Sequence, residues 1–316
     1  MIFFVKILKF FSLSIFLLIL GGIAFYWEND LPIETIKTKY ANADSKFLKV
    51  DGMEVHFRDQ GPANDSIPVV LLHGTGASLH TWEGWVAELS KTRRVITLDL
   101  PAYGITGPNP SGNYSMKAYS VFLKHFLDSI KVEYCILGGN SLGGSIAWNF
   151  ALDNQPLVEK LILVDAGGNS MKPKSMPIAF QLAKIPIVKN LFKYVTPRFI
   201  VEGSLRNVYG NPDLLQKSTI DRYFDLSLRA GNRQAFVDRL SSTTMRSNRF
   251  EELQNLKIPV LIIWGKKDLL IPIEVEKDFE AILNNEKVSI FETLGHVPME
   301  ENPKETVIPV LKFIKN

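Results

Sequence analysis

Short apolar runs alternate with helix-length segments along most of the chain. Six runs, mostly β-branched or aromatic and bounded by glycine or aspartate, predict buried strands at residues 69–72, 95–98, 134–137, 161–164, 260–263 and 288–291. Because helix-length segments separate these runs, the pattern predicts a doubly wound, mostly parallel α/β sheet. An earlier pair of runs flanks Asp51-Gly52, and this dipeptide predicts a β-hairpin.

One long interval interrupts this rhythm. Residues 165–259 contain no clear strand pattern, but they include several prolines and a helical periodicity over residues 212–240. We therefore expect an inserted helical cap over residues 168–255, between two parts of the α/β core at residues 47–167 and 256–316. The cap contains 14 Lys and Arg residues against 7 Asp and Glu residues, whereas the net charge of the whole chain is only +3.

The first 31 residues have the composition of a membrane segment. Residues 10–27 contain no charge, and 18 residues would span about 27 Å as a helix, close to the hydrocarbon thickness of a bilayer. Two lysines precede this run and two acidic residues follow it, so the positive-inside rule places the N-terminus in the cytoplasm and the remainder outside. We expect a single-pass transmembrane anchor over residues 1–31 and a linker over residues 32–46. The alternatives are a signal peptide, cleaved near Gly22-Ile23-Ala24 to give a secreted protein, and a buried helix.

Composition excludes several classes of protein. The single cysteine, Cys135, cannot form an intrachain disulfide, and we expect it to be a buried packing residue. The small net charge argues against a nucleic-acid-binding protein. The chain has neither a Cys/His ligand spacing nor a phosphate-binding G-x-x-x-x-G-K-[ST] loop, so we expect no metal and no organic cofactor.

The sharpest chemical signal is a G-x-S-x-G string, Gly139-Asn140-Ser141-Leu142-Gly143. It follows the predicted strand at residues 134–137 and precedes a helix-like stretch. A serine on so tight a turn needs small neighbours, and the helix N-terminus that follows directs amide dipoles at its oxygen. Ser141 is therefore our candidate nucleophile.

A serine nucleophile needs a base, and the base needs an acid that orients it. His296 follows the last predicted strand, at the sheet edge where Ser141 is also expected. Two aspartates end neighbouring strands, Asp165 and Asp268, and either one preserves the chain order Ser, Asp, His. We favour Asp268 for the shape of its loop and keep Asp165 as the alternate acid.

A developing oxyanion needs preorganised donors. The backbone N–H of Leu142, directly after the nucleophile, is the first candidate. The loop His73-Gly74-Thr75-Gly76 follows a buried strand and supplies the second, for which we select the N–H of Thr75.

With these residues in place, the chain from about Val50 onward resembles an α/β-hydrolase of the capped esterase/lipase type, most like the family V bacterial lipases. The resemblance rests on six segments in the family order: LLHGTGASLHTW, VITLDLPAYGITGP, LGGNSLGGSIAW, KLILVDAGG, LIIWGKKDLLIP and LGHVPMEENP. It implies Ser141 as nucleophile, His296 as base and Asp268 as acid, with the Thr75 and Leu142 amides as the oxyanion hole.

The resemblance also implies a function, hydrolysis of small-molecule or lipid carboxylic esters through an acyl-enzyme. The meta-cleavage-product C–C hydrolases share the G-N-S-[ML]-G-G elbow and are the main alternative. They usually have Arg after the triad acid and Trp after the histidine, where this chain has Leu269 and Val297. A non-catalytic binding protein of the same fold is the third hypothesis. We expect membrane contact through the N-terminal segment and, as a further hypothesis, through the basic cap, where three lysines interrupt an apolar stretch at residues 177–195.

Overall fold

The computed structural model describes residues 2–169, 172–242 and 249–315. Its strands are β1 (Ser45–Val50), β2 (Met53–Gln60), β3 (Val69–Leu72), β4 (Val95–Leu98), β5 (Cys135–Asn140), β6 (Val158–Val164), β7 (Val260–Gly265) and β8 (Glu286–Phe291). Its core helices are α3 (Glu83–Leu89), α4 (Met116–Ser129), α5 (Leu142–Asp153), α11 (Glu274–Ile282), α12 (Pro298–Glu301) and α13 (Pro303–Lys315). Two helices precede the core, α1 (Ile2–Phe25) and α2 (Ile33–Tyr40), and the cap contains α6 (Ile178–Leu182), α7 (Pro186–Phe192), α8 (Arg198–Val208), α9 (Lys217–Ser227) and α10 (Asn232–Ser241). Short 3-10 turns lie at Leu79–Trp82, Gln155–Leu157, Pro212–Leu214 and Phe250–Asn255.

The eight strands form one sheet in the order β1-β2-β4-β3-β5-β6-β7-β8. β1 and β2 pair antiparallel as the predicted hairpin, and β2 pairs antiparallel with β4. All the remaining pairs are parallel, so the predicted mostly parallel sheet is confirmed. In the register of the sheet, Leu72 of β3 lies beside Gly139 of β5, which brings the loops after these two strands together.

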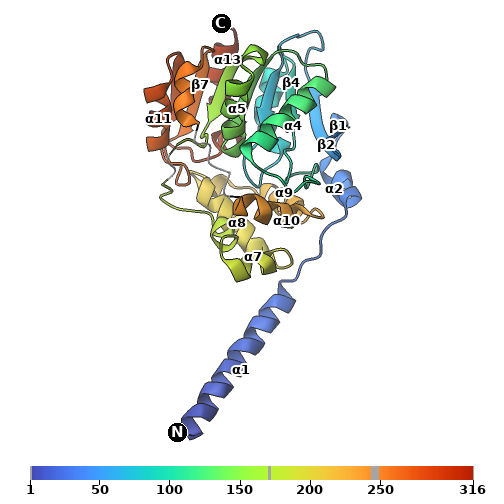
Figure 1. Ribbon diagram of the computed structural model, residues 1–316, viewed down its shortest axis with the longest axis vertical. Helices are drawn as coiled ribbons and strands as arrows, with labels where there is room; N and C mark the ends of the chain where they lie inside the picture. Colours follow the sequence, from blue (N-terminus) through green and yellow to red (C-terminus); the bar gives the residue numbers. More distant parts are fainter. Residues whose placement is uncertain (1, 170–171, 243–248, 316) are drawn as a thin grey trace.

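Helices cover both faces of the sheet because its central strands present apolar side chains on both sides (Figure 1). On one face, α4, α5 and α11 pack on the sheet through large side chains such as Phe126, Trp148 and Phe279. On the other face, α3 and α13 pack around Trp85 and Phe313. Cys135 is fully buried in the first of these layers, and burial raises the pKa of its thiol to about 12, consistent with a packing residue.

The interval between β6 and β7 forms a cap of short helices that lies against one end of the sheet (Figure 1). Prolines precede or begin α6, α7 and α8, which accounts for the division of this interval into short pieces. The segment expected to be a linker, residues 32–46, contains α2 and the start of β1. Ile36 of α2 is buried against Ile105 and Leu226, so this segment packs on both the core and the cap.

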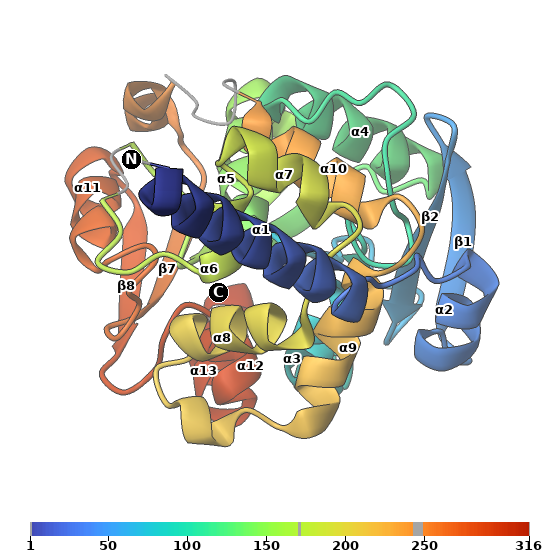
Figure 2. The same cartoon turned by 90° about the horizontal axis from the view of Figure 1, so that it is seen from below.

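Helix α1 extends away from the cap, and its described large apolar side chains, such as Phe10 and Leu18, are exposed (Figures 1 and 2). Within the described residues, no helix is both long enough and apolar enough to cross a membrane, so the expected transmembrane helix is not supported. The physical reason is that α1 ends at Phe25 and includes Lys6 and Lys9. Its charge-free part, Phe10 to Phe25, is about 24 Å long at 1.5 Å per residue, shorter than a hydrocarbon core of about 30 Å.

The segment after α1 is attached to the cap. Trp27 stacks on Tyr194 with ring centroids 5.2 Å apart, and it forms a β-bridge with Val195. Asp30 accepts a 2.6 Å hydrogen bond from the Arg233 guanidinium of α10. The exit of α1 is therefore fixed beside the cap helices.

Candidate active site

Ser141 occupies the sharp turn between β5 and α5. Its backbone has φ 54° and ψ −113°, a strained conformation for a residue with a side chain. A Cβ atom added to Gly143 would lie 2.1 Å from the Leu72 carbonyl oxygen, so glycine is required for α5 to approach β3 so closely. These two features place Ser141 at the carboxyl edge of the sheet, where the serine is 8% exposed.

His296 and Asp268 lie in the loops after β8 and β7. The His296 ring donates from Nδ1 to Asp268 Oδ2 at 2.6 Å, with both residues buried. The other carboxylate oxygen of Asp268 accepts the backbone N–H groups of Leu270 and Ile271 at 2.7 and 2.9 Å. Because these amides fix the carboxylate, the Nδ1–H tautomer of His296 is favoured, and Nε2 is left to accept a proton.

Asp165, the alternate acid, lies beside the His296–Asp268 pair and does not take part in its hydrogen bond. Its Oδ1 accepts the N–H of Gly265 at 3.0 Å, and its Oδ2 has no partner among the described residues. Burial, followed by the charge of Asp268, raises the pKa of Asp165 well above its usual range. The structure therefore pairs His296 with Asp268 and keeps Asp165 as a neutral neighbour.

Asp165, Asp268 and His296 form the one group in the described parts of the chain whose candidate ligand atoms are close enough to share a metal ion, within 4.8 Å of one another. The donor set fits a metal poorly. A protonated Asp165 is a weak ligand, and His296 Nδ1 is already bonded to Asp268.

The amide of Asn140 and the carboxylate of Glu301 fix the His296 loop. Asn140 Nδ2 donates to the His296 carbonyl at 2.9 Å, and Glu301 Oε1 accepts the Gly295 N–H at 2.7 Å. The other Glu301 oxygen accepts the N–H of Gly210 in the cap at 2.9 Å. Sequence reasoning missed both residues, although Asn140 adjoins Ser141 and Glu301 belongs to the LGHVPMEENP segment.

Thr75 and Leu142, the two expected oxyanion donors, both lie at the nucleophile. Neither of their backbone N–H groups has an acceptor among the described residues. Leu142 is the first residue of α5, whose N-terminal amides have no partner inside the helix. A Cβ atom on Gly74 would lie 2.8 Å from Asn140 Oδ1 and 3.2 Å from Ser141 Cβ, so this glycine permits the close approach of the Thr75 loop.

His73 holds the Thr75 loop in place. Its Nδ1–H donates to the Gly74 carbonyl at 2.8 Å, and its Nε2 accepts the N–H of Leu100 at 2.9 Å. Burial lowers the pKa of His73, so the ring stays neutral and keeps both bonds. His73 therefore has a structural role in this loop.

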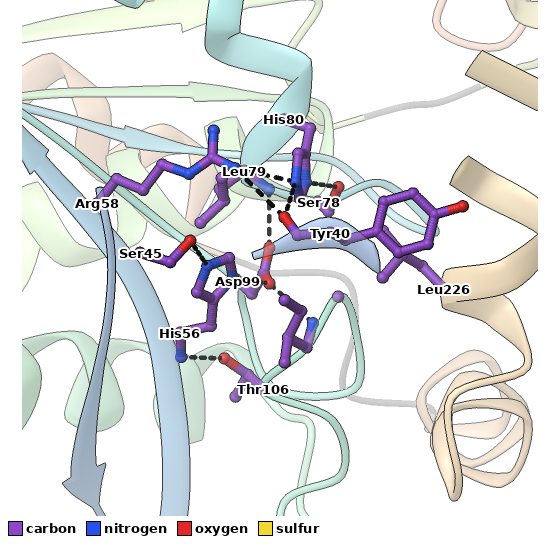
Figure 3. Close-up of polar contacts among 12 residues, drawn as sticks. Tyr40, Ser45, His56, Arg58, Ser78, Leu79, His80, Asp99, Thr106 and Leu226 are labelled. Atoms are coloured by element: carbon purple, nitrogen blue, oxygen red, sulfur yellow. Dashed lines mark hydrogen bonds and ion pairs between the residues drawn. The ribbon is translucent and has the colours of Figure 1, made fainter. Parts of the chain in front are cut away.

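Asp99 organises a buried polar cluster beside the same loop (Figure 3). Its carboxylate accepts the N–H groups of Leu79 and Ile105, each at 2.8 Å, and the Nδ1–H of His56 at 2.7 Å. Burial tends to raise the pKa of Asp99, but His56, His73 and His80 together outweigh this effect and hold the pKa below its usual range. Asp99 therefore ties together three segments: the one that follows the Thr75 loop, the one that follows β4, and strand β2.

A second Ser-His-Asp set has the same order of contacts as a catalytic triad (Figure 3). The Ser45 hydroxyl lies 2.8 Å from His56 Nε2, and His56 Nδ1 lies 2.7 Å from Asp99. This second set differs in its surroundings. The Ser45 hydroxyl also accepts the N–H of Asn42, and the residue lies in β1, not at a helix N-terminus. We therefore assign the set a structural role.

Ser141 and His296 line one cavity between the core and the cap, with about 130 Å³ of water-accessible volume. Most of its wall is apolar. The cap contributes Phe180, Phe192, Val201, Leu205, Val208 and Phe236. A cavity with this lining suits the hydrocarbon part of a substrate.

Comparison with known proteins agrees with this geometry. A family model described as the alpha/beta hydrolase fold matches residues 67–199. An uncharacterized protein of Mycobacterium tuberculosis is 30% identical over 295 residues, covering 85% of this chain and 80% of that protein. The chain therefore belongs to the α/β-hydrolase superfamily.

One further relative and one solved structure have described activities. The 2-hydroxy-6-oxo-2,4-heptadienoate hydrolase of Pseudomonas putida is 26% identical over 276 residues, covering 81% of this chain and 91% of that protein. The crystal structure of a membrane phospholipase A, described as a bacterial virulence factor, matches with a TM-score of 0.73 and 22% identity. That match covers 99% of this chain and 97% of the other, and at this identity it shows a shared fold.

Proposed function

We propose that this protein is a serine hydrolase that cleaves carboxylic esters through an acyl-enzyme on Ser141. The observation that supports the proposal most is that the N–H groups of Thr75 and Leu142, which have no acceptor among the described residues, belong to residues that line one cavity with a strained serine. Donors arranged in this way before the reaction stabilise the oxyanion of an acyl-transfer intermediate. The capped apolar cavity at Ser141, which suits an acyl chain, gives further support.

The proposed mechanism uses the geometry of the three residues in two half-reactions. His296 Nε2 accepts the Ser141 proton as Oγ attacks the ester carbonyl, and Asp268 stabilises the imidazolium through Nδ1–H. The imidazolium then protonates the leaving alcohol, which gives the acyl-enzyme. In the second half, water attacks the acyl group while His296 takes its proton, and the acid and free Ser141 are released.

Hydrolysis of p-nitrophenyl esters of increasing acyl length tests this proposal, with Ser141→Ala as the control. We expect turnover by the parent and a loss of about 10⁴-fold or more in the variant. Equal rates for parent and variant, or no ester hydrolysed at any chain length, would contradict it. The absence of any turnover would instead favour the non-catalytic member of the fold.

A second candidate reaction is hydrolytic C–C cleavage of a meta-cleavage product. The observation that favours it is the similarity to the Pseudomonas putida hydrolase across 81% of the chain. Leu269 and Val297, after the acid and the histidine, weigh against it. Incubation with 2-hydroxy-6-oxo-dienoates separates the two reactions, because turnover of these compounds in the absence of ester turnover would favour C–C cleavage.

We further propose that α1 attaches the protein to a lipid surface. The proposal is supported by exposed apolar side chains of α1, such as Phe10 and Leu18, and by the docking of Trp27 on the cap. Flotation with phospholipid vesicles should retain the full chain and lose a chain that lacks residues 1–25. Equal flotation of both chains would contradict attachment through α1, and an intact mass that lacks the N-terminal residues would favour signal cleavage and secretion.

A further inference from the structure

Ser141 borders a second cavity, which differs in character from the apolar one. Its volume is about 220 Å³, and Thr75, Ser141 and Leu142 are among the residues that line it. The cap contributes two basic side chains to its wall, Arg239 and Lys184. A bound ester would therefore have an apolar space on one side of its carbonyl carbon and a basic space on the other.

Arg239 is buried without a counter-ion. The residue, in α10, is 6% exposed, and no carboxylate of the described residues lies within 4.0 Å of its guanidinium. Its Nε has no hydrogen-bond partner in the described structure. The two other buried cap arginines differ, because Arg222 pairs with Glu300 and Arg233 pairs with Asp30.

A guanidinium remains protonated at all physiological pH values, so Arg239 cannot lower the cost of burial by losing its proton. A buried charge without an opposite charge nearby is costly, and an anion bound beside it would lower that cost. The hydroxyls of Tyr103 and Tyr119 lie beside Arg239, and neither brings a negative charge to the guanidinium. Burial raises the pKa of Tyr103, while the nearby Arg239 opposes this shift, so the hydroxyl remains a neutral donor.

We propose that Arg239 binds a phosphate or carboxylate group in the alcohol part of the ester, while the acyl chain lies in the apolar cavity. This inference rests on ester hydrolysis at Ser141 and specifies its substrate class. The planar fork of donors on arginine suits both anions, and Lys184 adds a second positive charge to the lining of the same cavity. The substrate is then an amphiphile with an acyl chain and an anionic head.

Three matched esters test the assignment with the full-length protein: a 1-acylglycerol, the corresponding acylglycerate and the corresponding 1-acylglycerol 3-phosphate. We expect kcat/KM of the parent to be at least tenfold higher for one of the two anionic esters than for the neutral one. The preferred anion identifies the head group. In Arg239→Gln this ratio should fall at least tenfold, whereas Arg239→Lys, which keeps the charge, should retain part of it.

Lys189→Gln is the matched control, because Lys189 is a cap lysine outside the linings described for both cavities. Its ratio should equal that of the parent, and thermal melting should show that each variant is folded. The assignment is overturned if the parent does not prefer either anion, or if Arg239→Gln lowers all three rates by one common factor. Hydrolysis of the neutral ester alone would refute this inference and leave the proposed function intact, whereas hydrolysis of none of the esters would refute both.

Discussion

Replacement of Asp268 by asparagine tests the geometry of the proposed triad directly. The backbone N–H groups of Leu270 and Ile271 both donate to Asp268 Oδ1, so an oxygen must occupy that position in any side chain placed there. In Asp268→Asn the amide oxygen satisfies this requirement, and the NH₂ group is forced toward His296 Nδ1. His296 must then accept at Nδ1 and carry its proton on Nε2.

A histidine protonated on Nε2 cannot take the proton of Ser141. The site is buried, with Asp268 2% and His296 4% exposed, so water cannot easily compensate for the wrong tautomer. We therefore expect kcat to fall about 10⁴-fold, the loss typical of this substitution in a triad, which is about 5.5 kcal/mol. Hydrolysis of a p-nitrophenyl ester measures this loss, with Ser141→Ala as the baseline.

Asp165→Asn is the matched comparison, because it replaces one neutral buried side chain by another. Its kcat should remain within about tenfold of the parent. If Asp165→Asn loses activity as severely as Asp268→Asn, or if Asp268→Asn stays within tenfold of the parent, the assignment of Asp268 as the orienting acid is wrong.

Two further predictions address the oxyanion loop and its support. Gly74→Ala places a methyl group 2.8 Å from Asn140 Oδ1 and should displace the Thr75 amide, lowering kcat about 10²–10³-fold while the protein stays folded by circular dichroism; an unchanged kcat would show that this loop does not provide a donor. Burial lowers the pKa of His80 to about 4 from an ordinary 6.5. Between these two pH values the unfolded chain binds a proton that the folded protein excludes, so the free energy of unfolding should fall as the pH drops from 6.5 toward 4. Urea unfolding should show that the free energy of unfolding of His80→Gln declines less than that of the parent over this pH range. An equal decline in parent and variant would contradict a role of His80 in this pH dependence.

The sequence predicts the sheet well because each buried strand is a short apolar run with clear boundaries. All six core runs became strands, and the hairpin at Asp51-Gly52 formed as expected. Strand ends were less predictable, since β5 continues to Asn140 through two glycines that favour no particular secondary structure. The helix α2 was missed because its eight residues have weak amphipathic character and are held in place by tertiary contacts of Ile36.

The candidate site divides in a similar way. Ser141, His296 and the Thr75 loop lie in local motifs, so sequence alone could nominate them. The loop shape favoured Asp268 over Asp165 but did not exclude Asp165, because the distance from each carboxylate to His296 joins separate loops and is seen only in the fold. Arg239 could not be nominated either, because its significance comes from the lack of a carboxylate neighbour in the folded protein.

The N-terminal segment shows a limit of counting uncharged residues. The run of 18 uncharged residues continues past the end of α1 at Phe25, and Trp27 docks on the cap instead of extending the helix. Composition could not reveal this docking, because it depends on Tyr194 and Val195, which are far away in the sequence.

The central claim is that Ser141 becomes acylated during ester hydrolysis. Acid quenching of the protein with a long-chain p-nitrophenyl ester, followed by intact mass and peptide analysis, measures this directly. We expect one acyl group per chain, located on the peptide that contains Ser141 and absent from Ser141→Ala, together with an initial burst of p-nitrophenol. Rapid ester turnover without a burst or an adduct, or an adduct on another residue, would contradict the account.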